Sequence, residues 1–294
     1  MILNFIILIV ISFFWALGFL FVKVGERSIT PITEMTARAF IAGLALLVIC
    51  LLLKKNVGKN LSKFRAFIVF SILGISIPWL GIAYSEEIIS SGLAAAMLST
   101  LPIFTFIITA FIIKTERFTM YGFAGLLIAL IGLVLVIGIE KIFGHSSTLM
   151  GVLIILGAFF SYAVNGIIVP IYAKNVDPLI TTTYTICFGA IIIAVLAFTF
   201  EKPTMADLNT EDVLSLIGLG VISTAVLFSG YYVLLKRAGP FFTSLLGYFA
   251  PVFGVIAGVI FLHEHINLLQ ILGIFLVLLG VLLINKPKWD NLHK

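Results

Sequence analysis

Long apolar runs separated by short polar linkers dominate the chain. Each run is continuously hydrophobic and about as long as the roughly 20 residues of helix that cross a bilayer. Strands of a membrane barrel would instead alternate apolar and polar residues in segments of about ten. The pattern predicts an all-α integral membrane protein with ten transmembrane helices, over residues 2–22, 34–53, 66–84, 92–113, 119–139, 150–171, 180–200, 213–235, 241–262 and 267–285.

Composition supports a membrane protein and argues against other classes. The chain is 62% hydrophobic and 11% charged, whereas roughly 25% of the residues in a soluble domain are charged. The linkers are too short for a soluble domain. We therefore expect a multi-pass protein of the cell (inner or plasma) membrane. The basic residues form no surface interleaved with aromatic residues, so nucleic-acid binding is not expected.

The basic residues predict the orientation of the chain. If the N-terminus is cytoplasmic, 13 of the 18 Lys and Arg residues fall in cytoplasmic segments, including the cluster at 54–65. Four would lie outside and one, Arg38, within a span. Because cytoplasmic loops carry an excess of Lys and Arg, both termini are predicted to be cytoplasmic.

Two segments about half a chain apart resemble each other. "ERFTMYGFAGLLIALIGLVL" and "EHINLLQILGIFLVLLGVLL" share their glycines when aligned at a constant offset. The matched glycines are Gly125 with Gly273 and Gly132 with Gly280, and after one-residue shifts of the alignment Pro102 matches Pro251, Pro31 matches Pro178, and Trp15 matches Tyr162. The chain therefore reads as two five-helix halves, 1–141 and 149–286. Five is odd, so the second half is predicted to be inverted, as in many secondary transporters.

Several motifs resemble one known family. "FFWALGFLFVK", "TARAFIAG" and "SSGLAAAMLSTLPIFTFIITAFIIKTERFT" are similar to the first, second and fourth helices of EamA-type members of the drug/metabolite transporter superfamily. The resemblance covers essentially the whole chain. It implies ten helices in an inverted five-plus-five repeat and transport of small metabolites, commonly export of amino acids or related compounds. Ala16 after Trp15 and "GAFFSYAVNG" in the second half depart from the family pattern and leave the subfamily and substrate open.

Two matched prolines are candidate hinges. Pro102 and Pro251 each lie about ten residues into a predicted span. A proline there removes one helical hydrogen bond and frees the carbonyl four residues earlier, on Leu98 and Gly247. Such carbonyls are tolerated in a membrane where protein or cavity water satisfies them. The two helices either line a cavity and act as hinges, or are simply kinked and packed.

Aromatic and amide side chains within the spans are candidates for the wall of a substrate cavity. Mid-helix Trp and Tyr need partners for their polar atoms, which a cavity supplies, although each is also compatible with ordinary packing. The predicted set is Trp15, Trp79, Tyr84, Tyr162, Asn165, Tyr231 and Tyr248. Glycines seven apart, such as Gly125 and Gly132, return to one helix face and favour close helix packing.

Arg38 is the deepest charged residue, and Glu34 lies one helical turn before it. The acid stands N-terminal to the base at i and i+4, which favours an ion pair. We interpret Glu34 and Arg38 as a structural ion pair in preference to a substrate contact, because the family resemblance implies an Arg here whatever the substrate.

These observations predict a secondary transporter that exports a small metabolite, such as an amino acid, by alternating access. The sequence contains no phosphate-binding loop, so the substrate gradient, exchange or protons would supply the energy. No cofactor or metal site is predicted, and no motif of a known enzyme class is present. A multidrug or quaternary-cation exporter of the same superfamily is the alternative, and an integral-membrane enzyme is the alternative from another class.

Overall fold

The computed structural model describes residues 2–25, 28–90, 93–94, 97–113, 120–137, 146–201, 208–262 and 267–292. Glu116 and Glu264, which begin the two similar segments, lie outside these ranges. The first half contains α1 (Ile2–Gly25), α2 (Pro31–Leu52), η1 (Val57–Lys63), α3 (Phe64–Ser71), η2 (Ile72–Ser76), α4 (Ile77–Glu86), α6 (Thr100–Ile107), η3 (Ile108–Ile112) and α7 (Met120–Ile137). The second contains α9 (Ser146–Tyr172), α10 (Pro178–Phe200), α11 (Thr210–Ile217), η4 (Gly218–Val226), α12 (Leu227–Ser244), α13 (Leu246–Leu262) and α14 (Leu268–Leu292).

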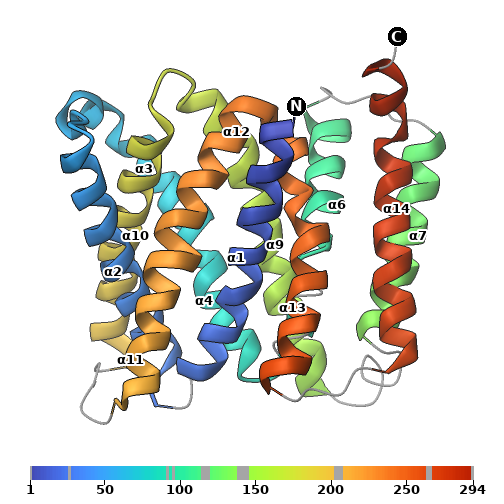
Figure 1. Ribbon diagram of the computed structural model, residues 1–294, viewed down its shortest axis with the longest axis horizontal. Coiled ribbons are helices and arrows are strands. Elements are labelled where there is room, and N and C mark those ends of the chain that lie inside the picture. Colours follow the sequence, from blue (N-terminus) through green and yellow to red (C-terminus); the bar gives the residue numbers. More distant parts are fainter. Residues whose placement is uncertain are drawn as a thin grey trace.

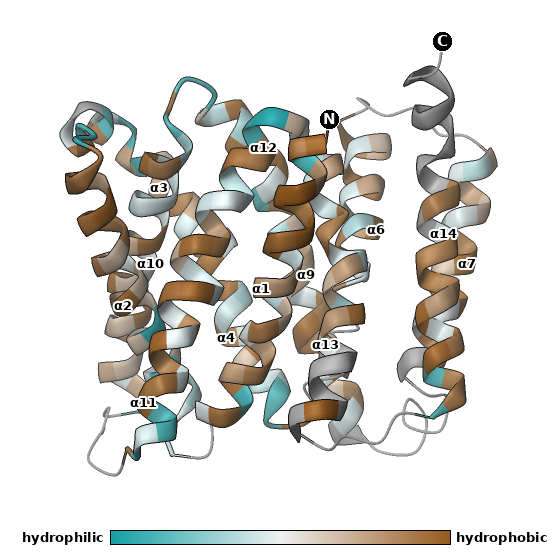
Figure 2. Ribbon diagram, in the orientation of Figure 1, coloured by the Kyte–Doolittle hydropathy of each residue, from teal (hydrophilic) through white to brown (hydrophobic). Residues whose placement is uncertain are grey.

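The helices have the length and hydropathy of membrane spans. Within the described ranges, six stretches are long and apolar enough to cross a bilayer: Ile2–Gly25, Pro31–Leu52, Asn60–Glu86, Thr148–Tyr172, Pro178–Phe200 and Thr210–Pro240. Four shorter apolar helices accompany them: Thr100–Ile112, Met120–Gly132, Phe242–Gly254 and Leu268–Gly280. Hydrophobic residues run along the helices and hydrophilic ones gather near their two ends (Figure 2). The predicted membrane class is confirmed.

Local sequence signals explain where the helices begin and break. Pro31 and Pro178 occupy the first turn of α2 and α10, where a missing N–H costs nothing. Asp177 caps α10 by accepting a hydrogen bond of 2.9 Å from the Leu179 N–H. Near the end of α12, Gly239 adopts a φ of 81°, which favours glycine, and Pro240 follows. This kink separates the span of α11, η4 and α12 from the segment that leads into α13.

The helices pack in reciprocal pairs. α1 packs on α13 in the way that its counterpart α9 packs on α6. α2 packs on α10, its own counterpart, and α7 packs on α14, its own counterpart; the latter pair stands at one edge of the bundle (Figure 1). A two-fold relation between the halves requires this pattern, because it exchanges each helix with the one that matches it in sequence.

Glycines bring α7 and α14 into close contact. A Cβ placed on Gly132 would lie 2.6 Å from the Gly273 carbonyl oxygen, and one on Gly280 would lie 2.6 Å from the Ala129 backbone nitrogen and meet the Gly125 carbonyl. Gly132 thus meets Gly273 while Gly280 meets Gly125, so the two helices run antiparallel. The predicted packing role of these glycines is confirmed.

Two π-helical segments occupy matched places. η2 precedes α4 and η4 precedes α12, so each lies in the middle of its membrane span. A π-helical turn shifts the backbone register and leaves carbonyls available to side chains. The Leu73 carbonyl of η2 accepts from the Ser161 hydroxyl at 2.7 Å, and the Ser223 carbonyl of η4 accepts from Arg38 at 3.4 Å.

The bundle has two distinct ends. The terminal end holds the start of α1, the end of α14 and the link from α9 to α10 (Figure 1). There, the Lys55 ammonium pairs with the Asp177 carboxylate at 2.7 Å. The opposite end holds the turn from α1 to α2 and the end of α10, where Thr30 donates to the Glu201 carboxylate.

Candidate functional site

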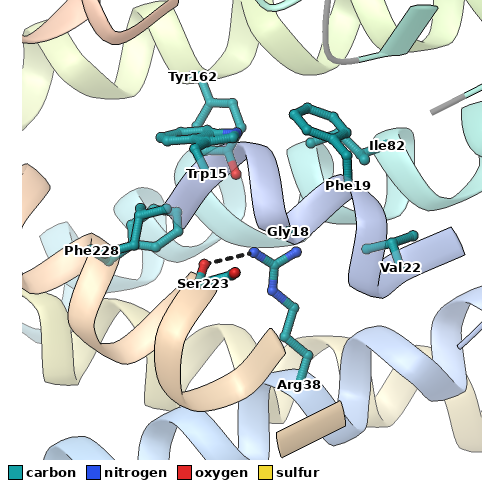
Figure 3. A pocket seen from close by; sticks show the side chains of 10 residues that line it. Trp15, Gly18, Phe19, Val22, Arg38, Ile82, Tyr162, Ser223 and Phe228 are labelled. Atoms are coloured by element: carbon teal, nitrogen blue, oxygen red, sulfur yellow. Dashed lines mark hydrogen bonds between the residues drawn. The ribbon is translucent and has the colours of Figure 1, made fainter. Parts of the chain in front are cut away.

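Trp15 and Tyr162, the matched aromatics of the two halves, lie against each other. Their ring centroids are 5.2 Å apart in an edge-to-face arrangement, and both side chains are buried. Phe228 from α12 completes the cluster, 5.7 Å from Trp15 and 6.4 Å from Tyr162. Figure 3 shows the three rings together beside Gly18 of α1. The positions that matched in sequence therefore meet where the two halves touch.

Arg38 reaches from α2 toward the same cluster. Its Nε donates to the Thr224 hydroxyl at 2.8 Å, and a terminal nitrogen donates to the Ser223 carbonyl (Figure 3). Its guanidinium carbon lies 3.9 Å from the Trp79 ring centroid, a cation–π contact. A second terminal nitrogen approaches the Met35 sulfur at 3.8 Å. The hydrogen bonds of this buried cation therefore go to neutral groups, while Glu34 and Glu86 interact with it electrostatically.

The ion pair between Glu34 and Arg38 stays a prediction: Glu34 acts electrostatically on Arg38, but the hydrogen bonds of Arg38 go to other groups. Although both residues lie one turn apart on α2, Glu34 packs against Gly25, whose missing side chain leaves room for the carboxylate. The Arg38 guanidinium donates to the Ser223 carbonyl in the π-helical segment η4 and lies over the face of the Trp79 ring. The i, i+4 spacing identified neighbours on the helix but not the direction in which each side chain leaves it.

The second half repeats this arrangement with different side chains. Asn165, matched to Gly18, lies against Gly74 of η2 and donates to the Tyr232 hydroxyl at 3.4 Å. At the matched place, Ser223 of η4 lies against Gly18, 3.5 Å from where a Cβ on that glycine would stand. Gly74 and Gly18 of the first half therefore each lie against a polar side chain of the second half.

Two cavities lie near these residues, and they differ greatly in size. The smaller measures about 10 Å³, close to the space of one water molecule. Its lining includes Trp15, Arg38, Tyr162, Ser223 and Phe228. The larger measures about 380 Å³, within the range of small-molecule sites. It lies between α9, α10 and α12 at the terminal end, with Lys174, Thr181, Tyr232 and Lys236 in its lining.

The remaining predicted wall residues divide into central and peripheral ones. Trp79 lies under Arg38, and the Tyr231 ring lies 6.2 Å from that of Trp15. Tyr248 is buried on α13 but lines neither cavity among the described residues. Tyr84 is 37% exposed at the opposite end, where its hydroxyl donates to Glu201 at 3.5 Å. The structure thus places Tyr84 away from the cluster, because it ends its helix next to Glu86.

The two candidate hinge prolines lie where α6 meets α13. Both are buried, and a Cβ on Gly247 would lie 2.6 Å from the Leu98 carbonyl oxygen and 2.9 Å from Pro102. The Leu98 carbonyl accepts the Leu101 N–H at 3.0 Å, so a tightened turn satisfies the group that Pro102 frees. Whether Pro102 and Pro251 act as hinges stays a prediction.

Sequence reasoning missed Ser223 and Thr224 as the partners of Arg38. They are adjacent polar residues in the middle of an apolar run, and the repeat matches Ser223 to Gly74. The difference between Gly74 and Ser223 at matched positions was the sequence signal that marked Ser223 as a candidate site residue. It could not identify Arg38 as the partner, because 186 positions separate Arg38 from Thr224.

The opposite end is held together by contacts between separate helices. The Lys23 ammonium of α1 donates to the Glu86 carbonyl at the end of α4. The Glu201 carboxylate of α10 accepts the backbone N–H groups of Ile32 and Thr33, at 3.0 and 2.8 Å, in the first turn of α2. Glu34 and Glu86 are fully buried beside these contacts.

The fold and the site define a multi-pass helical membrane protein with polar and aromatic side chains gathered between two matched sets of helices. The model of the EamA-like transporter family matches residues 3–138 and again residues 149–286, and the chain belongs to this family. The protein is therefore a membrane transporter with a small-molecule substrate.

Individual relatives agree with this assignment. The chain is 27% identical to the uncharacterized transporter YoaV of Bacillus subtilis (strain 168), over 93% of this chain and 94% of that protein. It is 28% identical to an uncharacterized transporter of Archaeoglobus fulgidus, over 97% and 99%. A crystal structure with 17% sequence identity superposes with a TM-score of 0.73, covering 96% of this chain and 97% of the other, and so shares the fold.

Proposed function

We propose that the protein is a secondary transporter of the cell membrane, built from ten transmembrane helices as an inverted repeat of residues 1–141 and 149–286, with both termini cytoplasmic. The contact between Trp15 and Tyr162 is the single observation that carries the proposal. It brings matched residues of the two halves into contact, and inverted-repeat transporters bind substrate between their halves. The reciprocal contacts of Gly132 and Gly280 support the inversion.

Alternating access is supported by the difference between the two ends. The larger cavity lies at the terminal end, while the opposite end is closed by contacts of Lys23 and Glu201 that join separate helices. Under this proposal the larger cavity opens to the cytoplasm. The central cluster of Trp15, Tyr162 and Phe228 is then the deepest point that a substrate entering from the cytoplasm would reach. Rocking one half against the other would open the opposite end.

The proposed substrate is a small metabolite, such as an amino acid or a related compound, and the proposed direction is export. A cavity of about 380 Å³ suits a molecule of that size. Energy would come from the substrate gradient, exchange or coupled protons. A multidrug or quaternary-cation exporter is disfavoured because no carboxylate belongs to the described lining of either cavity.

A flux measurement tests the proposal and separates it from an integral-membrane enzyme. Purified protein is first screened by thermal shift against a metabolite panel, and any hit is then measured by counterflow in proteoliposomes. Trp15→Ala and Tyr162→Ala should each lower flux while the protein remains monodisperse. Tyr121→Ala, at a half-exposed position on α7, is the matched control and should leave flux unchanged. Unchanged flux in both cluster variants would remove the site assignment, and absence of any flux would remove the transporter proposal.

A further inference from the structure

The residues that line the larger cavity have counterparts in the first half of the chain. The offset that matches Trp15 with Tyr162 also matches Val22 with Val169, Lys23 with Pro170, Ile29 with Val176, Pro31 with Pro178, and Glu34 with Thr181. The offset that matches Gly74 with Ser223 also matches Ala83 with Tyr232 and Glu86 with Leu235. In each of these pairs the second residue lines the cavity of about 380 Å³ at the terminal end.

The counterparts in the first half are packed together at the opposite end. Val22, Ile29, Glu34, Ala83 and Glu86 are each at most 7% exposed. They come from the end of α1, the turn into α2, the first turns of α2 and the end of α4. The same positions of the repeat therefore surround an open cavity at the terminal end and a closed, filled space at the opposite end.

The closed space contains charged groups that the open cavity lacks at the matched positions. The Lys23 ammonium donates to the Glu86 carbonyl and so joins α1 to α4. The carboxylates of Glu34 and Glu86 are fully buried, and both interact electrostatically with Arg38. Charges of both signs in one buried cluster compensate each other, but burial still removes their hydration. Opening this space to water would restore that hydration.

The repeat relates the two ends physically. An approximate two-fold axis that exchanges the halves also exchanges the ends of an inverted repeat. If each half can adopt the arrangement that the other has in this structure, the cavity moves from the terminal end to the opposite end. The residues of the first half that match the cavity lining are then the residues that become accessible.

We propose that Val22, Lys23, Glu34, Ala83 and Glu86 line a second cavity, which opens at the opposite end in the other conformation of the transporter. The charged side chains of this second cavity pair with protein groups when the end is closed and are hydrated when it is open, so they form the gate of that end. The proposal rests on the proposed transport function and deepens it by assigning the residues of the exit route. A solute would pass from uncharged positions at one end to charged ones at the other.

Thiol reactivity tests the second cavity. Ala83→Cys and Val22→Cys each place a thiol in the proposed lining, one from α4 and one from α1. The protein is reconstituted in lipid nanodiscs, where a charged maleimide reaches both ends of the bundle, and labelling of each cysteine is followed by peptide mass spectrometry. The native Cys50 and Cys187 are monitored in every sample.

Ala39→Cys is the matched control for Ala83→Cys. Both alanines are fully buried and belong to the first half, but Ile186, the counterpart of Ala39, is fully buried and lies outside the described lining of the larger cavity. An alternative conformation populated at roughly 0.1 to 10% exposes Ala83 and Val22 but not Ala39. Labelling of Ala83→Cys and Val22→Cys should therefore be about tenfold or more faster than labelling of Ala39→Cys.

A second set of variants tests the charged gate. Lys23→Met removes one base from the cluster and leaves the buried acids undercompensated, which favours the hydrated, open arrangement. It should raise labelling of Ala83→Cys roughly tenfold, since removal of one partner of a buried charge cluster is strongly unfavourable to the closed state. Adding Glu86→Leu, the residue found at the matched position, restores the charge balance and should return labelling toward the starting rate. Lys63→Met is the control, because the Lys63 ammonium also donates to a carbonyl, that of Tyr172, but at the terminal end.

The outcomes separate the second cavity from the transport function. Equal labelling of Ala83→Cys and Ala39→Cys, in protein that supports counterflow of any metabolite, would overturn the second cavity and leave transport standing. Labelling that Lys23→Met does not change, or that Lys63→Met changes equally, would overturn the gate. The expected labelling pattern without counterflow of any compound in the panel would overturn the transport function. If Ala83→Cys does not fold, the comparison of Val22→Cys with Ala39→Cys decides the question.

Discussion

The two ends of the bundle share one backbone plan but carry different chemistry. The repeat matches charged residues at the opposite end with uncharged ones at the terminal end: Lys23 with Pro170, Glu34 with Thr181, and Glu86 with Leu235. Pro170, Thr181 and Leu235 line the open cavity of about 380 Å³, while their charged counterparts lie buried or tied across helices. The matched positions therefore differ in side-chain chemistry, and the larger cavity lies at the end where these positions are uncharged.

The contact between α7 and α14 is the most symmetric part of the molecule, and breaking it should have the largest effect. Gly280→Ala would put a methyl group against the backbone of α7, which cannot move aside as a side chain can. We expect destabilisation of about 3 kcal/mol, typical of severe overpacking, measured by thermal unfolding in detergent.

Gly157→Ala is the control for that variant. Gly157 also lies in a helix, but nothing stands within 4 Å of the added methyl group. This change should be neutral or stabilising by up to about 1 kcal/mol, because alanine favours helix over glycine. Equal stability of the two variants would contradict the close packing of α7 and α14.

Glu201 tests the closed end. Its carboxylate accepts two backbone N–H groups and the hydroxyls of Thr30 and Thr33, so it joins α10 to the first turn of α2. Glu201→Ala should cost about 2 kcal/mol, as expected for charge-assisted hydrogen bonds, and Glu201→Gln less. Limited proteolysis of the turn from α1 to α2 should rise in parallel. An unchanged melting temperature would show that this tie does not hold the end closed.

The glycines at the centre sharpen the contrast between the halves. A methyl group on Gly74 would lie 2.8 Å from the Asn165 side-chain carbon, whereas one on Gly18 would lie 3.5 Å from the Ser223 Cβ and 3.9 Å from its hydroxyl oxygen. Gly74→Ala should therefore be less stable than Gly18→Ala by about 1 to 2 kcal/mol, through displacement of Asn165 from Tyr232.

Rescue would identify the cause. Asn165→Gly removes the side chain that the new methyl group meets, and it places in the second half the glycine that the first half has at position 18. The double variant Gly74→Ala, Asn165→Gly should recover part of the stability lost in Gly74→Ala, measured by the same melting experiment. No recovery would mean that Gly74 is needed for the π-helical backbone rather than for space.

Asp177 caps α10 at the terminal end, as Glu201 binds the first turn of α2 at the opposite end. Its substitution should have the smallest effect. Burial raises the pKa of its carboxyl, but hydrogen bonds from Lys55 and the Leu179 N–H outweigh burial and lower the pKa below its usual 3.8. Asp177→Ala should cost about 1 kcal/mol through loss of the helix cap, and Asp177→Asn should retain most of the cap.

The pH dependence of this contribution follows from the lowered pKa. Because folding favours the ionised carboxylate, Asp177 stabilises the protein above the usual carboxyl pKa, and this contribution is lost as pH falls through the lowered value. The difference in melting temperature between wild type and Asp177→Asn should therefore shrink below about pH 4. A difference that grows on acidification would contradict the assigned direction.

Several features of the site could be predicted because they depend on pattern alone. The matched positions of Trp15 and Tyr162 predicted a shared place between the halves, and the rings are in contact. Glycines seven residues apart predicted close packing, which Gly132 and Gly280 provide. The position of Tyr84 in an apolar run does not predict whether it lines the cavity, because Tyr84 lies near Glu86 at the end of its helix and is 37% exposed.

The sequence by itself determined the membrane class, the family, the approximate extent of the helices that follow Pro31 and Pro178, and the matched positions of the repeat. These follow from hydrophobic run length, from proline stereochemistry and from duplication, all of which are written along the chain. Tertiary structure decided the partners of Arg38, the direction of Glu34 and the end at which the larger cavity lies. Those depend on contacts such as Arg38 to Thr224, across 186 positions, where local spacing carries no information about the direction of a side chain.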